Sequence, residues 1–560
     1  MTISVKNLLL LVLFFITGII KLSAQTLPDS ITQKIDNLFK QWNTDKSPGC
    51  AIGIVRNDSL IYAKGYGMAN LEYGIAITPE TIFHMASVSK QFTAFSILLL
   101  AKQGKLKLDD DIHTWLPWFP DLKEKITIHH LLNHTSGIRD QWQLLAIAGT
   151  RIDDVITQEH IVKVLSKQQA LNFKPGAQYS YSNSGFTMLA EIVKSVSRQT
   201  LRQFTDSAIF KPLGMNNTHF HDDYTEIVKN RAYSYSRDFP GPFTNSILSY
   251  SNAGATSLFT NIRDMSKWLM NFYNHQLGDK AIIELLTQKS TLNSGASLNY
   301  AMGIVADTYK GWRQYQHSGG DAGFRTYVAT FPDLKMGFVV FSNLADVNTI
   351  EKTNQVADLF IRDTTTKTPA VRIDSSRTII KDTLHVKNFA GNFISEDGAQ
   401  FSFALRHQQF YWERNGRSDL LCQGVKDSFY VAKTPEVKFV FSALANKTVL
   451  VNQYWPDNER LLKKYTADSA PTDKQLQVYA GVYHCPELDC KYAIIVKDHA
   501  LVMTNNKYED SKIKLVGKDD LFTDYWWMRH IRIINDDKNT ITGFEVNDGR
   551  IMHLKFNKIQ

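Results

Sequence analysis

Cysteine is scarce in this chain, with four among 560 residues. Four cysteines are too few for a fold that depends on a framework of disulfides. Cys485 and Cys490 flank a short segment and would close a small loop in an oxidising compartment, whereas a pair of free thiols is the alternative. His130 and His134 are four residues apart, but Thr-Ser-Gly follows directly and favours a structural turn over a zinc site, so we expect no metal.

Long apolar runs are also few. The first residues contain one from Leu8 to Ile20, with Lys6 before it and Ala24 shortly after it. This pattern is typical of a secretory signal peptide over residues 1–24, and the run is short for a membrane span. We therefore expect an exported protein, periplasmic or secreted, with no stable membrane span after cleavage; an uncleaved anchor is the alternative.

Excess charge is small as well. The net charge of +8 falls to +6 when the signal peptide and its two lysines are removed, which is little for a chain of this size. The composition therefore argues against a nucleic-acid partner. The 43% hydrophobic and 21% charged residues are ordinary for a globular protein, and the length predicts two or three domains.

Residues 25–362 carry the pattern of a first domain that mixes helices and strands. A buried helix is predicted over 92–100, because nearly all its residues are apolar. Strand-like runs occur at 50–55, 60–63, 324–331 and 336–341. These patterns together predict an α+β domain with a mainly antiparallel sheet flanked by helices.

The rest of the chain contains a repeat. A polar segment without periodicity, predicted as a linker over 363–385, comes before it. Phe-Ala-Gly-Asn-Phe at 389–393 matches Tyr-Ala-Gly-Val-Tyr at 479–483, and short alternating strands follow each copy. We predict two small antiparallel barrels in tandem, over 386–466 and 474–560.

A possible nucleophile precedes the buried helix in the segment Ser87-Val88-Ser89-Lys90. A serine hydroxyl is a poor nucleophile until a base takes its proton, and Lys90 lies one helical turn after Ser87 on the same face. Burial among apolar side chains would disfavour the ammonium form of Lys90. The segment therefore predicts a Ser87 nucleophile with Lys90 as its base.

Two further segments supply the other groups that acyl transfer needs. Tyr181 can shuttle a proton between Ser87 and the leaving group, and the Asn183 amide can orient Lys90 and the substrate. Taken alone, these two would be loop residues with local hydrogen bonds.

His317-Ser318-Gly319-Gly320 lies just before a predicted strand. Gly319 would let the substrate approach the backbone, and the Gly320 amide can form an oxyanion hole with that of Ser87. We expect His317 and Ser318 to bind the substrate together with Gly319. The alternative for His317 is a structural hydrogen-bonding role.

These motifs, in this order, resemble the serine beta-lactamase and penicillin-binding-protein-like superfamily, in particular its class C-like branch of D-aminopeptidases, DD-peptidases and esterases. Further segments of residues 30–345 are similar to those of the branch, among them Leu131-Leu132-Asn133-His134-Thr135-Ser136-Gly137 and Tyr300-Ala301-Met302-Gly303. The resemblance implies Ser87 as nucleophile, Lys90 and Tyr181 as the proton-transfer pair and Asn183 as orienter. His317-Ser318-Gly319 stands where class C lactamases carry Lys-Thr-Gly, so weak beta-lactam turnover is expected at most.

The two barrels are also similar to the layout of D-aminopeptidases of this branch, which implies lipocalin-like barrels. In such proteins a barrel loop can lie over the active site, and residues 524–529 are the candidate here; burial in the barrel core is the alternative for their aromatic side chains.

Three functions follow from this reading. The first is a hydrolase that acts through an acyl-Ser87 intermediate on small peptides or amides with D-residues, some of them derived from cell walls. The second is an esterase at the same site, and the third is a covalent sensor or ligand-binding scaffold that uses the barrels. None of them requires a cofactor.

Overall fold

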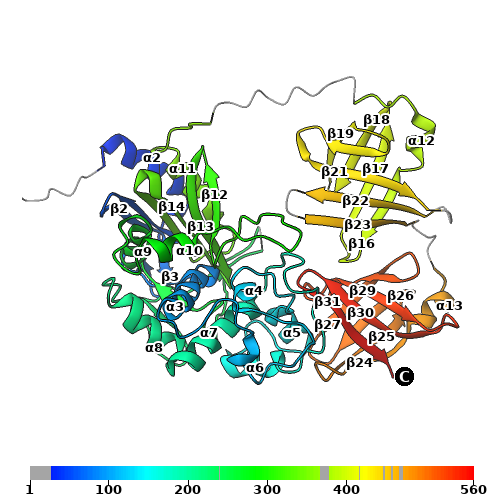
Figure 1. Ribbon diagram of the computed structural model, residues 1–560, viewed down its shortest axis with the longest axis horizontal. Helices are drawn as coiled ribbons and strands as arrows, with labels where there is room; N and C mark the ends of the chain where they lie inside the picture. The colour runs from blue at the N-terminus through cyan, green and yellow to red at the C-terminus, as the bar shows by residue number, and fades with distance from the viewer. Residues whose placement is uncertain are drawn as a thin grey trace, which may run out of the picture.

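The computed structural model describes residues 27–559 except 239, 366–377, 415, 445–447, 456–457 and 466–470. The predicted signal peptide lies outside these residues. Figure 1 shows a mixed helix and sheet domain and two barrels beside it. Within the described part of the chain, no helix is long and apolar enough to cross a membrane.

The first domain is built on one antiparallel sheet of six strands. The strand order is β12 (Val305–Tyr309), β13 (Trp312–Asp321), β14 (Phe324–Phe331), β15 (Met336–Ser342), β1 (Cys50–Arg56) and β2 (Ser59–Tyr66). Every residue of β15 is buried, and all of β1 except its last residue. Strands so thoroughly apolar are covered on both faces.

Successive residues of β1 point into two different cores, as the two-residue period of a strand requires. Ile52 and Ile54 pack on the outer face with helices α2 (Asp29–Phe39) and α11 (Thr349–Ala357). The inner face contacts α9 (Ile262–Asn274) and the helical part of the domain. The sheet thus lies between two layers of helices (Figure 1).

Helix α3 (Lys90–Lys102) crosses the centre of the inner core, where most of its residues are buried. It packs against α7 (Asn183–Ser197), and α7 in turn packs against α4 (Ile128–Leu132). The helix predicted over 92–100 lies within α3. Since α3 and α7 begin at residues of the predicted site, their packing brings distant parts of the sequence together.

The C-terminal part forms two closed, antiparallel barrels of eight strands. Barrel 1 runs from β16 (Gly391–Ser395) to β23 (Asn458–Tyr465), and barrel 2 from β24 (Gly481–Cys485) to β31 (Ile551–Lys558). The predicted α+β fold with two trailing barrels is confirmed. Helix α12 (Thr383–Lys387), which begins inside the predicted linker, packs on barrel 1.

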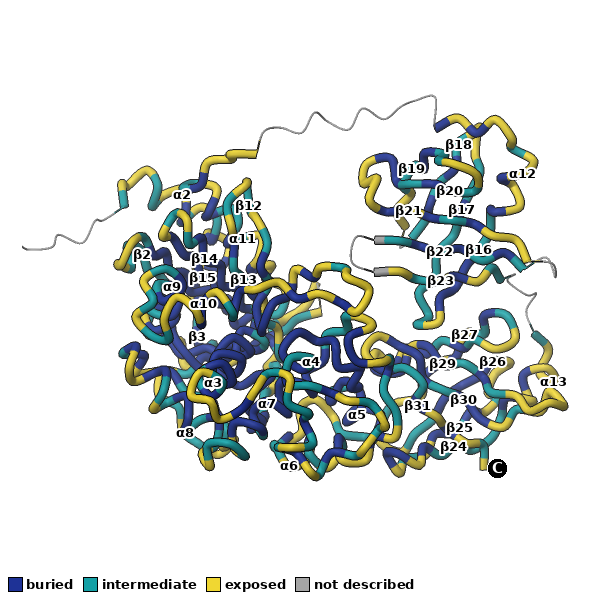
Figure 2. The backbone as a smooth tube through the Cα atoms, viewed as in Figure 1, coloured by how far each residue is buried: buried dark blue, intermediate teal, exposed yellow. Residues whose placement is uncertain are grey.

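The two barrels differ in how they join the first domain. Barrel 1 has a separate apolar core, whereas the core of barrel 2 is continuous with that of the first domain. In Figure 2 the helices α4 and α5 (Gln141–Ile147) lie directly beside the strands of barrel 2. Barrel 2 and the first domain therefore share one apolar core.

Polar contacts reinforce this junction. Arg139 donates to both carboxylate oxygens of Glu487 at 2.8 and 2.7 Å, and the side chains are 1% and 6% exposed. The same guanidinium donates to the carbonyl oxygens of Met552 and His553. A buried ion pair in which every guanidinium nitrogen is hydrogen-bonded to barrel 2 holds that barrel against the first domain.

Cys485 and Cys490 face each other as cross-strand partners at the start of barrel 2, and both thiols are free. The hairpin segment between them carries Glu487, so the two cysteines lie at the base of the loop that binds Arg139.

Candidate active site

Ser87 lies in a short 3-10 turn, Ala86–Ser89, directly before α3. Ala86 has a φ of +49°, an uncommon conformation for a residue with a Cβ. Ser89 holds the turn by donating to the Ala86 carbonyl at 2.5 Å and accepting from the Leu258 amide at 3.0 Å. The turn leaves Ser87 partly exposed among buried neighbours. Strained backbone of this kind is often stored at functional sites.

Lys90 is completely buried, and its ammonium group points back to the turn. Its Nζ donates to Ser87 Oγ at 3.2 Å, to Asn183 Oδ1 at 2.9 Å and to the Ala255 carbonyl at 2.7 Å. Three hydrogen bonds fix the nitrogen beside the serine oxygen. This is within the reach required of a general base.

The surroundings of Lys90 also change its proton affinity. Burial lowers the pKa of Lys90 to about 7; Asp321 and Asp140 oppose this shift and Arg550 adds to it. A lysine with this pKa is neutral in a large fraction of molecules near pH 7. Lys90 can therefore accept the Ser87 proton under ordinary conditions.

Tyr181 faces the same groups, and its ring centroid is 4.8 Å from Lys90 Nζ. Burial raises the pKa of Tyr181 well above its ordinary value, and the Ser87 hydroxyl and Arg550 guanidinium offset this only in part. The phenol therefore keeps its proton. This contrast favours Lys90 as the base and Tyr181 as a group that passes a proton on.

Asn183, the first residue of α7, is held by a residue that the sequence motifs did not reveal. Asp140 Oδ2 accepts from the Asn183 backbone amide at 2.8 Å and from its Nδ2 at 2.9 Å, which turns Oδ1 toward Lys90. Asp140 also caps helix α5 (Gln141–Ile147) by accepting from Trp142 N. In the sequence it is indistinguishable from any other N-cap aspartate.

His317 is buried, and its ring is fixed on both sides. Its Nε2 lies 3.0 Å from the Tyr300 hydroxyl, and its Nδ1 lies 2.6 Å from the Ser318 carbonyl oxygen. Burial lowers the pKa of His317 to about 3, so the ring is neutral. Among the residues predicted to bind substrate, Ser318 is exposed, whereas His317 is buried between Tyr181 and Tyr300.

The structure requires glycine at position 319 for a steric reason different from the one expected. A Cβ at this position would lie 2.4 Å from the Met85 carbonyl oxygen, because β13 passes directly over the nucleophile turn. Thr326 strengthens this contact by donating to the same carbonyl at 2.8 Å. The close passage brings the exposed backbone of Gly320 to the edge of the site. The predicted oxyanion pair of Ser87 and Gly320 stays a prediction.

Beside these groups lies a cavity of about 490 Å³ that barrel 2 helps to enclose. Arg550, in the turn between β30 (Ile541–Asp548) and β31, reaches furthest into the site: its guanidinium carbon is 4.7 Å from the centre of the Tyr181 ring. Trp526 and Arg529 of the predicted loop 524–529 line the same cavity. Tyr525 and Trp527 are instead buried in barrel 2, so both interpretations of that loop hold for part of it.

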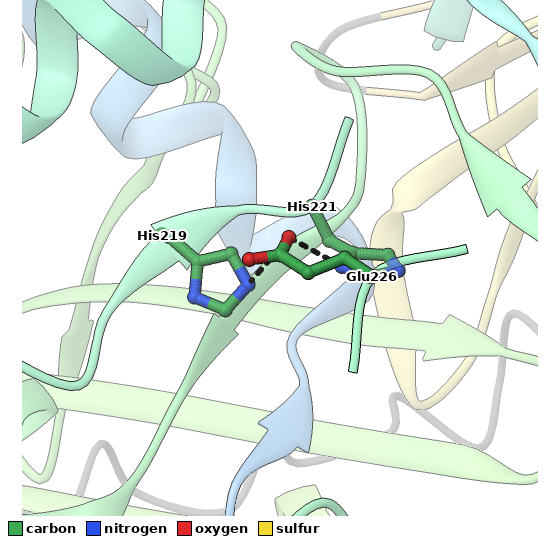
Figure 3. Close-up of side chains that lie close together, drawn as sticks. All are labelled: His219, His221 and Glu226. Carbon is green, nitrogen blue, oxygen red and sulfur yellow. Dashed lines mark ion pairs between the residues drawn. The ribbon is translucent and has the colours of Figure 1, made fainter. Parts of the chain in front are cut away.

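One group of side chains in the described residues has the composition of a metal site. His219, His221 and Glu226 present ligand atoms that all lie within 4.8 Å of one another (Figure 3). Arg202, however, donates to both oxygens of Glu226 at 2.6 and 2.7 Å. Because Arg202 already supplies the positive charge that a cation would bring, we interpret this group as an ion-pair cluster.

The histidines considered from sequence have separate contacts. His130 takes part in a capping box with Thr127 at the start of α4. His134 accepts from the Ser182 amide and packs against the Tyr181 ring at 4.2 Å between centroids. His134 thus supports the position of the candidate tyrosine.

The fold and the hydrogen-bonded pair of Ser87 and buried Lys90 define a serine hydrolase of the beta-lactamase and penicillin-binding-protein type. The Beta-lactamase family profile matches residues 35–361, more than half of the chain, and the chain belongs to this family. The resemblance drawn from the motifs is confirmed.

Relatives with known names agree with this assignment. The chain is 25% identical to penicillin-binding protein 4* of Bacillus subtilis over 421 residues, which cover 72% of this chain and 93% of that protein. It is 27% identical to the D-aminopeptidase of Brucella anthropi over 280 residues, covering 50% of this chain and about half (53%) of the relative.

Solved structures share the fold. The octameric penicillin-binding protein homologue from Pyrococcus abyssi superposes with a TM-score of 0.52 at 21% identity, covering 86% of this chain and 99% of that one. The D-amino acid amidase from Ochrobactrum anthropi superposes with a TM-score of 0.50 at 20% identity, covering 59% and 98%.

Proposed function

We propose that this protein is an exported amidase or peptidase that cleaves small amides and peptides containing D-residues through an acyl-Ser87 intermediate. The observation that carries the proposal is the buried Lys90, hydrogen-bonded to Ser87 and with its pKa lowered to about 7. Relatives named D-aminopeptidase and a structural neighbour named D-amino acid amidase support the substrate class.

The chemistry begins when neutral Lys90 takes the proton from the Ser87 hydroxyl. The serine oxygen then bonds to the substrate carbonyl carbon, and the backbone amides of Ser87 and Gly320 stabilise the oxyanion. Tyr181 donates its proton to the leaving nitrogen as the carbon–nitrogen bond breaks, and the Lys90 ammonium restores the phenol. Water cleaves the acyl-enzyme by the same steps in reverse.

The first test asks about the nucleophile without assuming a substrate. The mature protein and its Ser87→Ala variant are treated with a fluorophosphonate probe, and their intact masses are compared. One adduct confined to the wild type is expected. An equal adduct on the variant would refute the assignment of Ser87.

The second test separates amidase from esterase. A D-amino acid amide, its L-enantiomer and a simple ester of similar size are offered to the wild type and to Ser87→Ala. We expect turnover of the D-amide by the wild type alone. Fast ester cleavage without D-amide cleavage would instead establish an esterase at the same site.

A further inference from the structure

The cavity beside the catalytic groups is lined by guanidinium groups that the mechanism does not use. We propose that Arg550 and Arg325 form an anion subsite, and that the enzyme selects substrates bearing a carboxylate close to the scissile bond. This inference rests on the proposed function, because it names the kind of substrate that the Ser87 site takes.

Arg550 is placed by its backbone, which leaves its side chain available. Its amide donates to Gln143 Oε1 at 3.0 Å, and its carbonyl accepts from Asn172 Nδ2 at 2.9 Å. Within the described residues its guanidinium makes no hydrogen bond; it stacks on the Tyr181 ring and lies 3.7 Å from Asp140. The backbone of Arg550 is thus fixed, while the five donors of its guanidinium have no hydrogen-bond acceptor among the described residues.

The nearest carboxylate does not satisfy Arg550. Asp140 Oδ2 is 3.7 Å from the guanidinium, beyond hydrogen-bonding distance, and already accepts two hydrogen bonds from Asn183. Its Oδ1 accepts from Trp142 N. Asp140 therefore attracts Arg550 at a distance without using its donors.

Arg325 enters the cavity from the start of β14, on the opposite side from barrel 2. In the described part of the chain its guanidinium donates only to the carbonyl oxygens of Ala322 and Phe324. The neighbouring Asp321 also lines the cavity, but its Oδ2 is already hydrogen-bonded to His84 and Thr256 and makes no hydrogen bond to Arg325 among the described residues. Arg325 is therefore a half-buried cation without a carboxylate partner of its own.

The remaining charged group of the cavity is Arg529, which lies 3.6 Å from Asp548 and is largely exposed. It adds positive potential at the rim, while Asp548 balances most of its charge. The apolar lining comes from the stacked rings of Trp142 and Tyr250, 4.7 Å apart, and from Trp526. A compact ligand with a carbon body and one carboxylate matches this lining.

The carboxylate can belong to an acidic side chain or to a free C-terminus. Two matched pairs distinguish these sources: the p-nitroanilides of D-glutamate and D-glutamine, and D-alanyl-D-alanine and its C-terminal amide. The two members of each pair have nearly the same shape, and one carries a carboxylate where the other carries a neutral carboxamide. Their kcat/KM values are measured for the wild type and for Arg550→Met, Arg550→Lys and Arg417→Met.

We expect the wild type to prefer the charged member of at least one pair by about tenfold or more, since charge-assisted hydrogen bonds of this kind are worth that much. Arg550→Met should abolish the preference, and Arg550→Lys should keep part of it. Arg417→Met, which changes an exposed residue of barrel 1, should show the same preference as the wild type. A change in the pKa of Lys90 affects both members of a pair equally and cancels in the ratio. Absence of a preference in both pairs, or a preference that survives in Arg550→Met, would overturn the proposal.

A binding experiment keeps this test independent of the proposed reaction. Glutarate and glutaramide are titrated calorimetrically into the wild type and into Arg550→Met, each shown by thermal unfolding to be folded. Binding of glutarate alone, lost in the variant, would support the subsite even if no D-amide is cleaved. Equal binding of both compounds, or glutarate binding that the variant retains, would contradict it.

Discussion

The positive charge of Arg550 near Lys90 leads to a prediction of how the reaction rate depends on pH. Lys90 must be neutral to take the Ser87 proton, so kcat/KM should rise with pH through an acidic limb near the Lys90 pKa of about 7. Arg550 lowers this pKa, because its positive charge disfavours the lysine ammonium. Replacing Arg550 by Met removes that charge, so the Lys90 pKa should rise and the limb should move to higher pH.

The size of the shift follows from the geometry. Lys90 Nζ and the Arg550 guanidinium carbon lie 4.8 and 4.7 Å from the centre of the same Tyr181 ring, so they are at most about 9.5 Å apart. Two unit charges at about 9.5 Å interact by about 1.7 kcal/mol when the effective dielectric constant is about 20. This corresponds to about 1.3 pKa units. Because the Arg550 side chain is 44% exposed, solvent screening reduces the expected shift to between about half a unit and one unit.

The assay is the pH profile of kcat/KM for an uncharged amide or ester, measured from about pH 5 to 10 at constant ionic strength. The limb of Arg417→Met should coincide with that of the wild type, and higher salt should shrink the difference between wild type and Arg550→Met. An acidic limb that stays in place in Arg550→Met, or moves to lower pH, would refute the electrostatic reasoning.

Three further substitutions test other contacts. Asp140→Asn removes the charge that aligns Asn183 and should lower kcat more than it raises KM, by about tenfold in kcat; an unchanged kcat would exclude this positioning role. Gly319→Ala places a Cβ 2.4 Å from the Met85 carbonyl, so fluorophosphonate labelling of Ser87 should slow strongly while the circular dichroism spectrum stays the same; wild-type labelling would show that the turn can yield. Glu487→Gln leaves Arg139 buried without a countercharge. It should lower the free energy of unfolding, measured by urea denaturation, by about 3–5 kcal/mol. A loss under about 1 kcal/mol would mean that water or backbone carbonyls satisfy the guanidinium.

The sequence predicted those features whose signal is local. Ser87 and Lys90 are one turn apart at the start of a buried helix, and the two barrels repeat the same short pattern at their first strands. Both patterns can be recognised in the sequence without knowledge of the tertiary structure. The expected fold followed from such signals, whereas Tyr181 and Asn183 are ambiguous alone and were identified by the order of the motifs and the family resemblance.

Contacts between distant segments were beyond this kind of reasoning. Arg550 lies in a turn whose Asp-Gly sequence reveals a hairpin and nothing about what the hairpin faces. Asp140 has the appearance of a helix cap, which it also is. Gly319 was expected to admit substrate, but its missing side chain makes room for the Met85 backbone. In each case the decisive partner is supplied only by the packing of other elements.

The adjacency of Arg139 and Asp140 determines where the chain can be divided. One residue anchors barrel 2 through Glu487, and the next orients Asn183 beside Lys90. A fragment that ends before barrel 2 would expose this junction to solvent and remove the Glu487, Met552 and His553 acceptors that hold Arg139 next to Asp140. Among the described residues barrel 1 has an apolar core of its own, separate from that of the first domain, so a shortened but active enzyme is better sought by replacing residues 366–470 with a flexible linker than by expressing the first domain alone.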